Sequence, residues 1–189
     1  SSGALDFVRQ AREKGLNPLV GMEYRSGDRL LYIGIAQNEH GFKELNEWMT
    51  AIHKQASLLC PRAPAFEHVF VIYPLENKPD TALRPYEYVG IRPSELSQIV
   101  WHSPAVMERY VILSSVSFKS SDYKLHVQLR AIDNNLLISQ LQASQAGNRA
   151  EVMMPKAALM EAYSAFPMII SNTHSLLSQC SFSFNFSWI

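Results

Sequence analysis

Residues 16–45 constrain the fold more than any other stretch of this chain. They contain a short apolar run, a turn signal at residues 25–28, a second apolar run at residues 30–36, and then the polar Asn38. Two apolar runs joined by a Ser-Gly-Asp turn predict a β-hairpin, and a nearly continuous apolar strand is typical of a sheet covered on both faces. Asn38 then predicts the N-cap of a helix whose apolar residues recur at helical spacing. We therefore expect a strand, a turn, a strand and a helix, with Glu23 at the end of the first strand.

The remainder of the chain alternates runs rich in β-branched and aromatic residues with amphipathic helical patterns. Strands are expected at residues 68–73, 88–91 and 110–118, and further helices at residues 4–14, 121–132, 155–163 and 167–180. The run at 68–73 is apolar inside, which predicts a central strand, and the alternating tail from Ser181 is typical of an edge strand. Strands that alternate with helices predict an α/β fold with a mainly parallel sheet.

Composition excludes several classes of protein. Hydrophobic residues make up 47% of the 189 residues and charged residues 18%, which is ample for a core and excludes bulk disorder. Lys plus Arg equals Asp plus Glu at 17 each, so the chain lacks the basic surplus of a protein that binds nucleic acid by itself. Cys60 and Cys180 match no zinc spacing or disulfide framework, as expected for reduced thiols in a cytoplasmic protein. No apolar run reaches the roughly 20 residues that span a bilayer.

Side chains suited to catalysis or metal binding are few. Among the histidines only His68 begins a predicted strand, and no two histidines have the spacing of metal ligands. Glu23 has two interpretations: a catalytic carboxylate at a strand end, or the partner of a nearby Arg or Lys in an ion pair. The sequence contains no phosphate-binding glycine loop and no Gly-x-Ser-x-Gly elbow. The residues alone therefore predict an α/β domain without a complete active site.

Four segments, taken in order, carry a resemblance to a known family. They are SSGALDFVRQAREKGLNPLVGMEY at the start, LLYIGIAQNEHGFKELNEWMT, VILSSVSF followed by KLHVQLRAIDNN, and EAYSAFPMIISNTHSLLSQCSFSF. In this order they resemble the PHP (polymerase and histidinol phosphatase) domain of the bacterial C-family DNA polymerase, the DNA polymerase III alpha subunit. Asn172, Thr173 and Cys180 are in step with the family's closing helix. The match covers nearly the whole chain, which resembles an N-terminally truncated form of the domain.

The resemblance implies a particular fold. We expect an α/β protein built as an incomplete, distorted (β/α)7 PHP-type barrel with a helical C-terminal extension. Residues 1–135 would form the PHP-like α/β domain, lacking its first strand or strands. Residues 136–189 would form a helical segment leading toward the polymerase core.

The resemblance also assigns positions to a metal site. The family's glutamate ligand corresponds to Glu23, its histidine on the next strand to Leu31, and its final aspartate and histidine to Ser115 and Ser117. Leucine cannot bind a metal ion, and a neutral serine hydroxyl is a poor substitute for a carboxylate or an imidazole. We therefore expect a degenerate site in which Glu23 is the single retained ligand position, with no catalytic residue and no cofactor.

These positions lead to a scaffold as the expected function. The parent would be a DNA-directed DNA polymerase, a nucleotidyltransferase of DNA replication in the cytoplasm. Its partners would be the rest of the alpha subunit and the proofreading exonuclease subunit, with DNA contacted through other domains and no membrane.

Two alternatives remain open. One is an active metal-dependent PHP phosphoesterase or 3′–5′ exonuclease with Zn²⁺ or Mn²⁺, for which Glu23, His68 and His102 are the plausible ligands. The other is a free-standing binding module, which no sequence feature favours over the scaffold.

Overall fold

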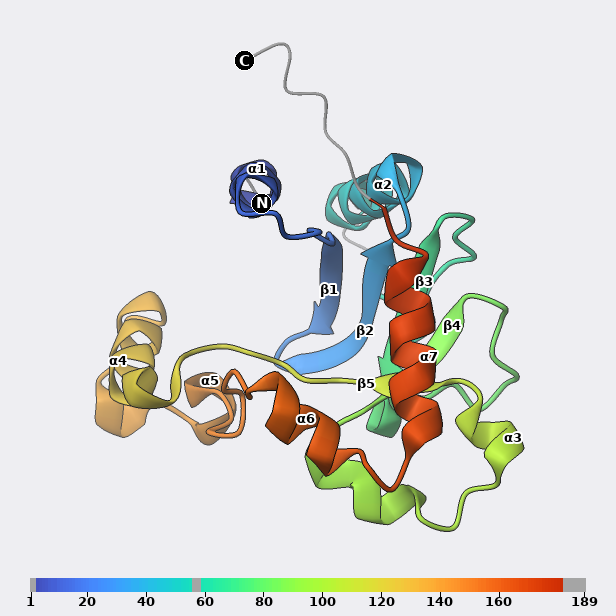
Figure 1. Ribbon diagram of the computed structural model, residues 1–189. Coiled ribbons are helices and arrows are strands. Elements are labelled where there is room, and N and C mark those ends of the chain that lie inside the picture. Colours follow the sequence, from blue (N-terminus) through green and yellow to red (C-terminus); the bar gives the residue numbers. More distant parts are fainter. Residues whose placement is uncertain (1–2, 56–58, 182–189) are drawn as a thin grey trace.

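The protein is built on an open five-stranded mixed sheet (Figure 1). The computed structural model describes residues 3–55 and 59–181, and its strands lie in the order β1-β2-β3-β4-β5. The strands are β1 (Gly21–Ser26), β2 (Arg29–Ala36), β3 (Val69–Pro74), β4 (Glu87–Ile91) and β5 (Tyr110–Ile112). β1, β2 and β3 pair antiparallel, whereas β3, β4 and β5 pair parallel. The expectation of a mainly parallel sheet was therefore wrong for the half that contains the hairpin.

The expected distorted (β/α)7 PHP-type barrel is also wrong. A barrel closes only when its first and last strands pair, and in the described residues β1 and β5 are the two separate edges of the sheet. The outer edge of β5 is instead covered by helix α7 (Pro167–Ser178). Thr173 Oγ1 accepts a hydrogen bond from the Ile112 N–H at 2.8 Å, and the Asn172 amide donates to the Tyr110 carbonyl at 3.0 Å. Side chains therefore occupy backbone groups that a further strand would need.

Helices surround the sheet and connect its strands. They are α1 (Gly3–Glu13), α2 (Glu39–Gln55), α3 (Pro104–Met107), α4 (Tyr123–Asp133), α5 (Ala143–Ala146), α6 (Lys156–Ala162) and α7. Single turns of 3₁₀ helix lie at Leu75–Asn77, Ser120–Asp122 and Ile138–Gln140, and a longer one lies at Pro93–Ile99. Within the described ranges, no helix combines the length and the apolar character needed to cross a membrane.

The predicted hairpin and helix cap are confirmed. β1 and β2 pair across a turn in which Gly27 has a positive φ of 60°, a conformation that glycine adopts readily. Tyr24 and Tyr32 face each other across this pair, with ring centroids 4.7 Å apart. Asn38 Oδ1 accepts hydrogen bonds from the backbone N–H groups of His40 and Gly41, so it caps α2 as its position before the helix predicts.

β3 is the centre of the core, as its apolar sequence predicts. All six of its residues are buried, and successive side chains point to opposite faces of the sheet. Val71 packs in a cluster with Leu45 of α2, whereas Phe70 packs with Leu176 of α7. The sheet is therefore covered on both faces, by α2 on one side and by α7 on the other.

The strand expected at residues 110–118 is much shorter than predicted. β5 ends at Ile112 because its neighbour β4 ends at Ile91, where Pro93 opens a 3₁₀ helix and leaves nothing to pair with. Phe118 makes only an isolated bridge to Val152. The chain then continues to α4 and α5, which lie to one side of the sheet (Figure 1).

Helices were expected at 155–163 and 167–180, and both are present as α6 and α7. The division into two units at residue 135 stays a prediction. Nearly all of the predicted edge strand from Ser181 lies outside the described residues.

Candidate functional site

Glu23 lies on β1 and forms an ion pair with Arg25. Its Oε2 accepts a hydrogen bond from Arg25 Nε at 2.8 Å, and its side chain is 47% exposed. The Arg25 guanidinium also donates to the Asp28 carbonyl in the hairpin turn. Of the two interpretations that the sequence leaves for this carboxylate, the geometry matches the ion pair.

Leu31 lies inside the core. It is 4% exposed and belongs to the cluster that contains Tyr24, Tyr32 and Leu45. A hydrocarbon side chain in this environment contributes packing and offers no ligand atom. The position assigned to a histidine ligand by the resemblance therefore serves the hydrophobic core in this chain.

Ser115 and Ser117 lie beyond the carboxyl ends of the parallel strands β4 and β5. This is the edge at which open α/β sheets usually bind ligands. Ser117 donates from Oγ to Glu151 Oε2 at 2.6 Å, and its N–H donates to the Glu151 carbonyl at 2.9 Å. Ser115 lines a cleft of about 130 Å³ together with Arg92 and Asn148. Of the two serine positions, Ser117 has a structural partner in the segment before α6.

Charged side chains of the cleft at this edge already have partners within the protein. Arg92 Nη1 lies 2.7 Å from Glu95 Oε1, and Arg92 Nη2 lies 3.7 Å from Glu76 Oε1, so carboxylates already neutralise its guanidinium. The Glu151 carboxylate is occupied by Ser117. A volume of about 130 Å³ is below the roughly 300–1,000 Å³ of typical ligand pockets. The cleft at this edge, where sequence and topology would place a site, is therefore small, and its charged side chains already have partners within the protein.

The two candidate histidines lie at different places and each has its own partner. His68 Nδ1 lies 2.9 Å from Glu44 Oε1, and Glu44 Oε2 accepts the Glu67 N–H at 3.0 Å, which ties α2 to the start of β3. His102 Nδ1 lies 2.8 Å from the Tyr110 hydroxyl. Over residues 3–55 and 59–181, no three His, Cys, Asp or Glu side chains are grouped so that they could hold a metal ion.

A buried carboxylate that the sequence reasoning missed is Glu87, at the start of β4. It is 2% exposed, and it accepts hydrogen bonds from Arg62 Nη2 at 2.7 Å, the Tyr73 hydroxyl at 2.9 Å and the Arg84 N–H at 2.7 Å. Burial opposes its ionisation, but these three donors outweigh burial and lower the pKa of Glu87. The only sequence signal for this site was a glutamate at the start of an apolar strand, together with Arg62 between two prolines upstream.

The bonds to Glu87 fix two loops to the sheet. Arg62 also donates to Thr81 Oγ1 and to the Ala82 carbonyl, so one guanidinium joins two surface segments to β4. Each carboxylate oxygen of Glu87 already accepts two hydrogen bonds. This arrangement is built for holding structure, because a carboxylate with every acceptor position filled has none left for a substrate.

Comparison with protein-family models and with curated proteins found no match to this sequence.

Proposed function

We propose that this chain acts as a non-catalytic scaffold in a bacterial C-family DNA polymerase, the DNA polymerase III alpha subunit. Four sequence segments in the family's order support the assignment to this polymerase. The fourth segment contributes Asn172 and Thr173, whose side chains hold α7 against the edge of β5. If the resemblance lies in residues that shape the fold, such residues should make structural contacts, as Asn172 and Thr173 do.

The observation that carries the scaffold role is the state of the positions assigned to metal ligands. Leu31 is buried in the core, Ser117 is bonded to Glu151, and Glu23 is paired with Arg25. A divalent site needs several anionic or imidazole ligands around one point. These three side chains are used instead for packing, for a loop contact and for a surface ion pair.

The proposed partners follow from this role. The scaffold would support the remainder of the alpha subunit and present a surface to the proofreading exonuclease subunit, in the bacterial cytoplasm. The DNA would be bound by other parts of the polymerase, since this chain carries no net charge.

A metal titration tests the non-catalytic part of the proposal. The purified chain is titrated with Zn²⁺ and with Mn²⁺, and phosphatase activity on p-nitrophenyl phosphate and 3′–5′ exonuclease activity on labelled single-stranded DNA are measured. We expect no stoichiometric binding and no turnover above that of the Glu23→Gln variant. Stoichiometric binding with turnover that Glu23→Gln abolishes would replace the scaffold with the alternative, an active PHP phosphoesterase or exonuclease.

A binding experiment tests the partner. The chain is co-expressed with the polymerase core of a C-family alpha subunit, and the complex is isolated through a tag on the core. We expect a one-to-one complex that survives gel filtration. Failure of the chain to co-purify, while it remains folded by circular dichroism, would reject the assignment to this polymerase.

A further inference from the structure

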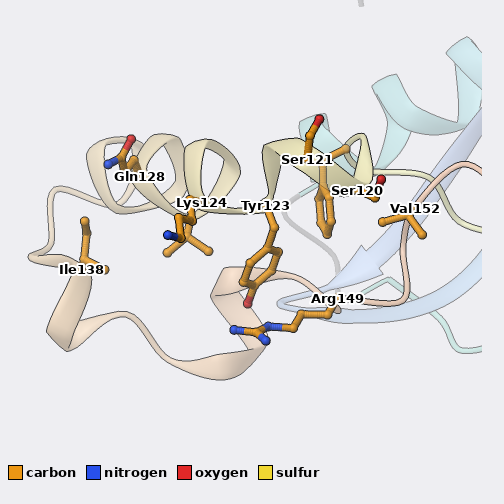
Figure 2. A pocket seen from close by; sticks show the side chains of 10 residues that line it. Ser120, Ser121, Tyr123, Lys124, Gln128, Ile138, Arg149 and Val152 are labelled. Atoms are coloured by element: carbon orange, nitrogen blue, oxygen red, sulfur yellow. The ribbon is translucent and has the colours of Figure 1, made fainter.

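A second cavity in the described part of the chain is separate from the strand-end cleft. It lies between α4 and the segment that contains Ile138 and Arg149, and its volume is about 830 Å³ (Figure 2). That volume falls within the roughly 300–1,000 Å³ of small-molecule sites. Phe118 and Val152, which bridge two extended segments, form its wall on the side of the sheet. The bridge between Phe118 and Val152 therefore forms one side of the cavity, and α4 forms the other.

The cavity has an excess of positive charge. Lys124 and Arg149 both line it, Figure 2 shows them flanking Tyr123, and none of its lining residues is acidic. Neither cation forms an ion pair with any carboxylate of the described residues, whereas Arg9, Arg25, Arg62, Arg84, Arg92 and Arg130 all do. Two acidic side chains lie next to the lining in sequence: Asp122 accepts a hydrogen bond from Ser121 Oγ at 2.7 Å, and Glu151 accepts one from Ser117 Oγ at 2.6 Å. Two unneutralised cations that share a cavity favour an anion between them.

Arg149 is held in place without losing its charge. Its guanidinium carbon lies 4.7 Å from the centre of the Tyr123 ring, which is a cation–π contact. Such a contact leaves the N–H groups at the rim of the guanidinium free to donate to phosphate oxygens, which this planar fork binds in pairs. Ser120 adds a hydroxyl to the same wall.

Apart from Ser121 and Gln128, the rest of the lining is apolar. Phe118, Val127, Ile138 and Val152 form a hydrocarbon and aromatic surface beside the two cations. An inorganic anion would leave this surface in contact with water, whereas an anion attached to a flat ring system would cover it. Nucleoside phosphates combine these two features.

We propose that this cavity binds a nucleoside 5′-phosphate, with the phosphate between Lys124 and Arg149 and the base against the apolar wall. The zero net charge of the chain favours a free nucleotide over the end of a nucleic-acid strand, because a strand requires an extended basic surface. The proposal does not depend on the scaffold role, since it uses none of the positions assigned to metal ligands.

Calorimetry on the full chain tests this site with AMP as the probe. Lys124→Gln and Arg149→Gln each remove one charge from an exposed side chain, and Lys156→Gln removes an equivalent charge on α6, outside the cavity. We expect saturable binding that weakens about tenfold in each cavity variant, the loss expected for one charged hydrogen bond. Lys156→Gln should bind AMP as the wild type does. Binding should also weaken as salt is raised.

Further ligands identify the group that is recognised. Inorganic phosphate and adenosine should each bind more weakly than AMP, because each lacks one half of the proposed contact. A 5′-phosphorylated oligonucleotide that binds more tightly than AMP, and loses affinity in both cavity variants, would support the phosphate contact and name a strand end as its source.

Several outcomes would overturn the proposal. They are no saturation at millimolar AMP, adenosine or inorganic phosphate binding as tightly as AMP, or equal affinities in the cavity variants and Lys156→Gln. Thermal melts that match the wild type would show that Lys124→Gln and Arg149→Gln are folded, so that a loss of binding reports on the cavity.

Discussion

Thr173 on α7 and Ile112 on β5 are joined by a hydrogen bond that ends the sheet. Thr173 Oγ1 accepts the Ile112 N–H at 2.8 Å while its own hydrogen is donated to the Ile169 carbonyl at 2.7 Å. An edge strand with free N–H groups is a template for pairing with another strand. The threonine hydroxyl satisfies one of these groups and so helps to fix β5 as the edge.

Thr173→Val should therefore destabilise the protein by about 1–3 kcal/mol, because it keeps the side-chain shape but leaves the Ile112 N–H without its partner. The measurement is urea unfolding followed by circular dichroism. Thr50→Val is a matched control, since the exposed Thr50 hydroxyl on α2 also donates to the carbonyl four residues earlier but accepts no bond from a strand. Equal losses in the two variants would remove the special role of Thr173.

Glu87→Gln should cost about 1.5–3 kcal/mol of stability, because it removes the buried carboxylate that accepts charge-assisted hydrogen bonds from the partly exposed Arg62 and from Tyr73. Glu47→Gln is the control. Its partner Lys43 lies 3.7 Å away on the exposed face of α2, and such pairs contribute about 0.5 kcal/mol or less. The free energies of unfolding of the two variants are compared in urea, and a loss for Glu87→Gln no larger than the control would contradict the structural role.

The same carboxylate predicts a dependence of stability on pH. Its pKa is lower in the folded chain than in the unfolded chain, where a glutamate has a pKa of about 4.3. The stability it contributes is therefore fully present above the unfolded value and is lost as the pH falls through the lower folded pKa. Acid titration of the melting temperature should show a drop in this range that is reduced in Glu87→Gln. Identical slopes in wild type and variant would argue against a lowered pKa.

Leu31→His should destabilise the protein without creating a metal site. A polar ring in place of a buried leucine loses its packing and has to be desolvated, at a cost of about 2–5 kcal/mol. Leu129→His on α4, where the side chain is exposed, should cost far less. The free energy of unfolding of both variants is measured with and without Zn²⁺. Stabilisation of Leu31→His by Zn²⁺ would revive the metal site at this position.

The two cysteines should differ sharply in reactivity. Burial raises the pKa of Cys180 to about 11, and its thiol donates to the Leu176 carbonyl, whereas Cys60 is exposed. Thiolate is the reactive form, so only Cys60 should react rapidly with a disulfide reagent at neutral pH. Cys60→Ser should then show no fast phase, and both thiols should react in denaturant. A rapid reaction in native Cys60→Ser would show that α7 opens from the sheet.

The hairpin, the Asn38 cap and the central place of β3 were predictable because each depends on residues that are neighbours in the chain. The length of β5 was not, since it ends where β4 stops offering a partner at Ile91. The helical stripe at Leu125, Leu129 and Ile132 predicts a buried face, yet all three are exposed. Local periodicity indicates that a face is apolar but not whether another element covers it.

Among the candidate sites, too, those formed by neighbours in the chain were predictable and those formed by distant residues were not. The sequence places Glu23 at a strand end, two residues before Arg25, and the structure extends β1 through Arg25 so that both side chains are exposed and can pair. The Glu87 site joins residues 25 positions apart, and the cavity of Lys124 and Arg149 joins α4 to a segment that follows α5. Pairings over such separations are set by how the elements pack, which no local pattern contains.

The sequence by itself therefore determined the combination of strands and helices, the hairpin and most of the secondary elements, because hydrophobic period, turn residues and capping act within a few residues. Only the tertiary structure decided that the sheet is open rather than closed into a barrel. At the β5 edge, Asn172 and Thr173 reach across some sixty residues of chain to satisfy backbone groups of Tyr110 and Ile112. An edge whose polar groups are already bonded has nothing to gain from another strand.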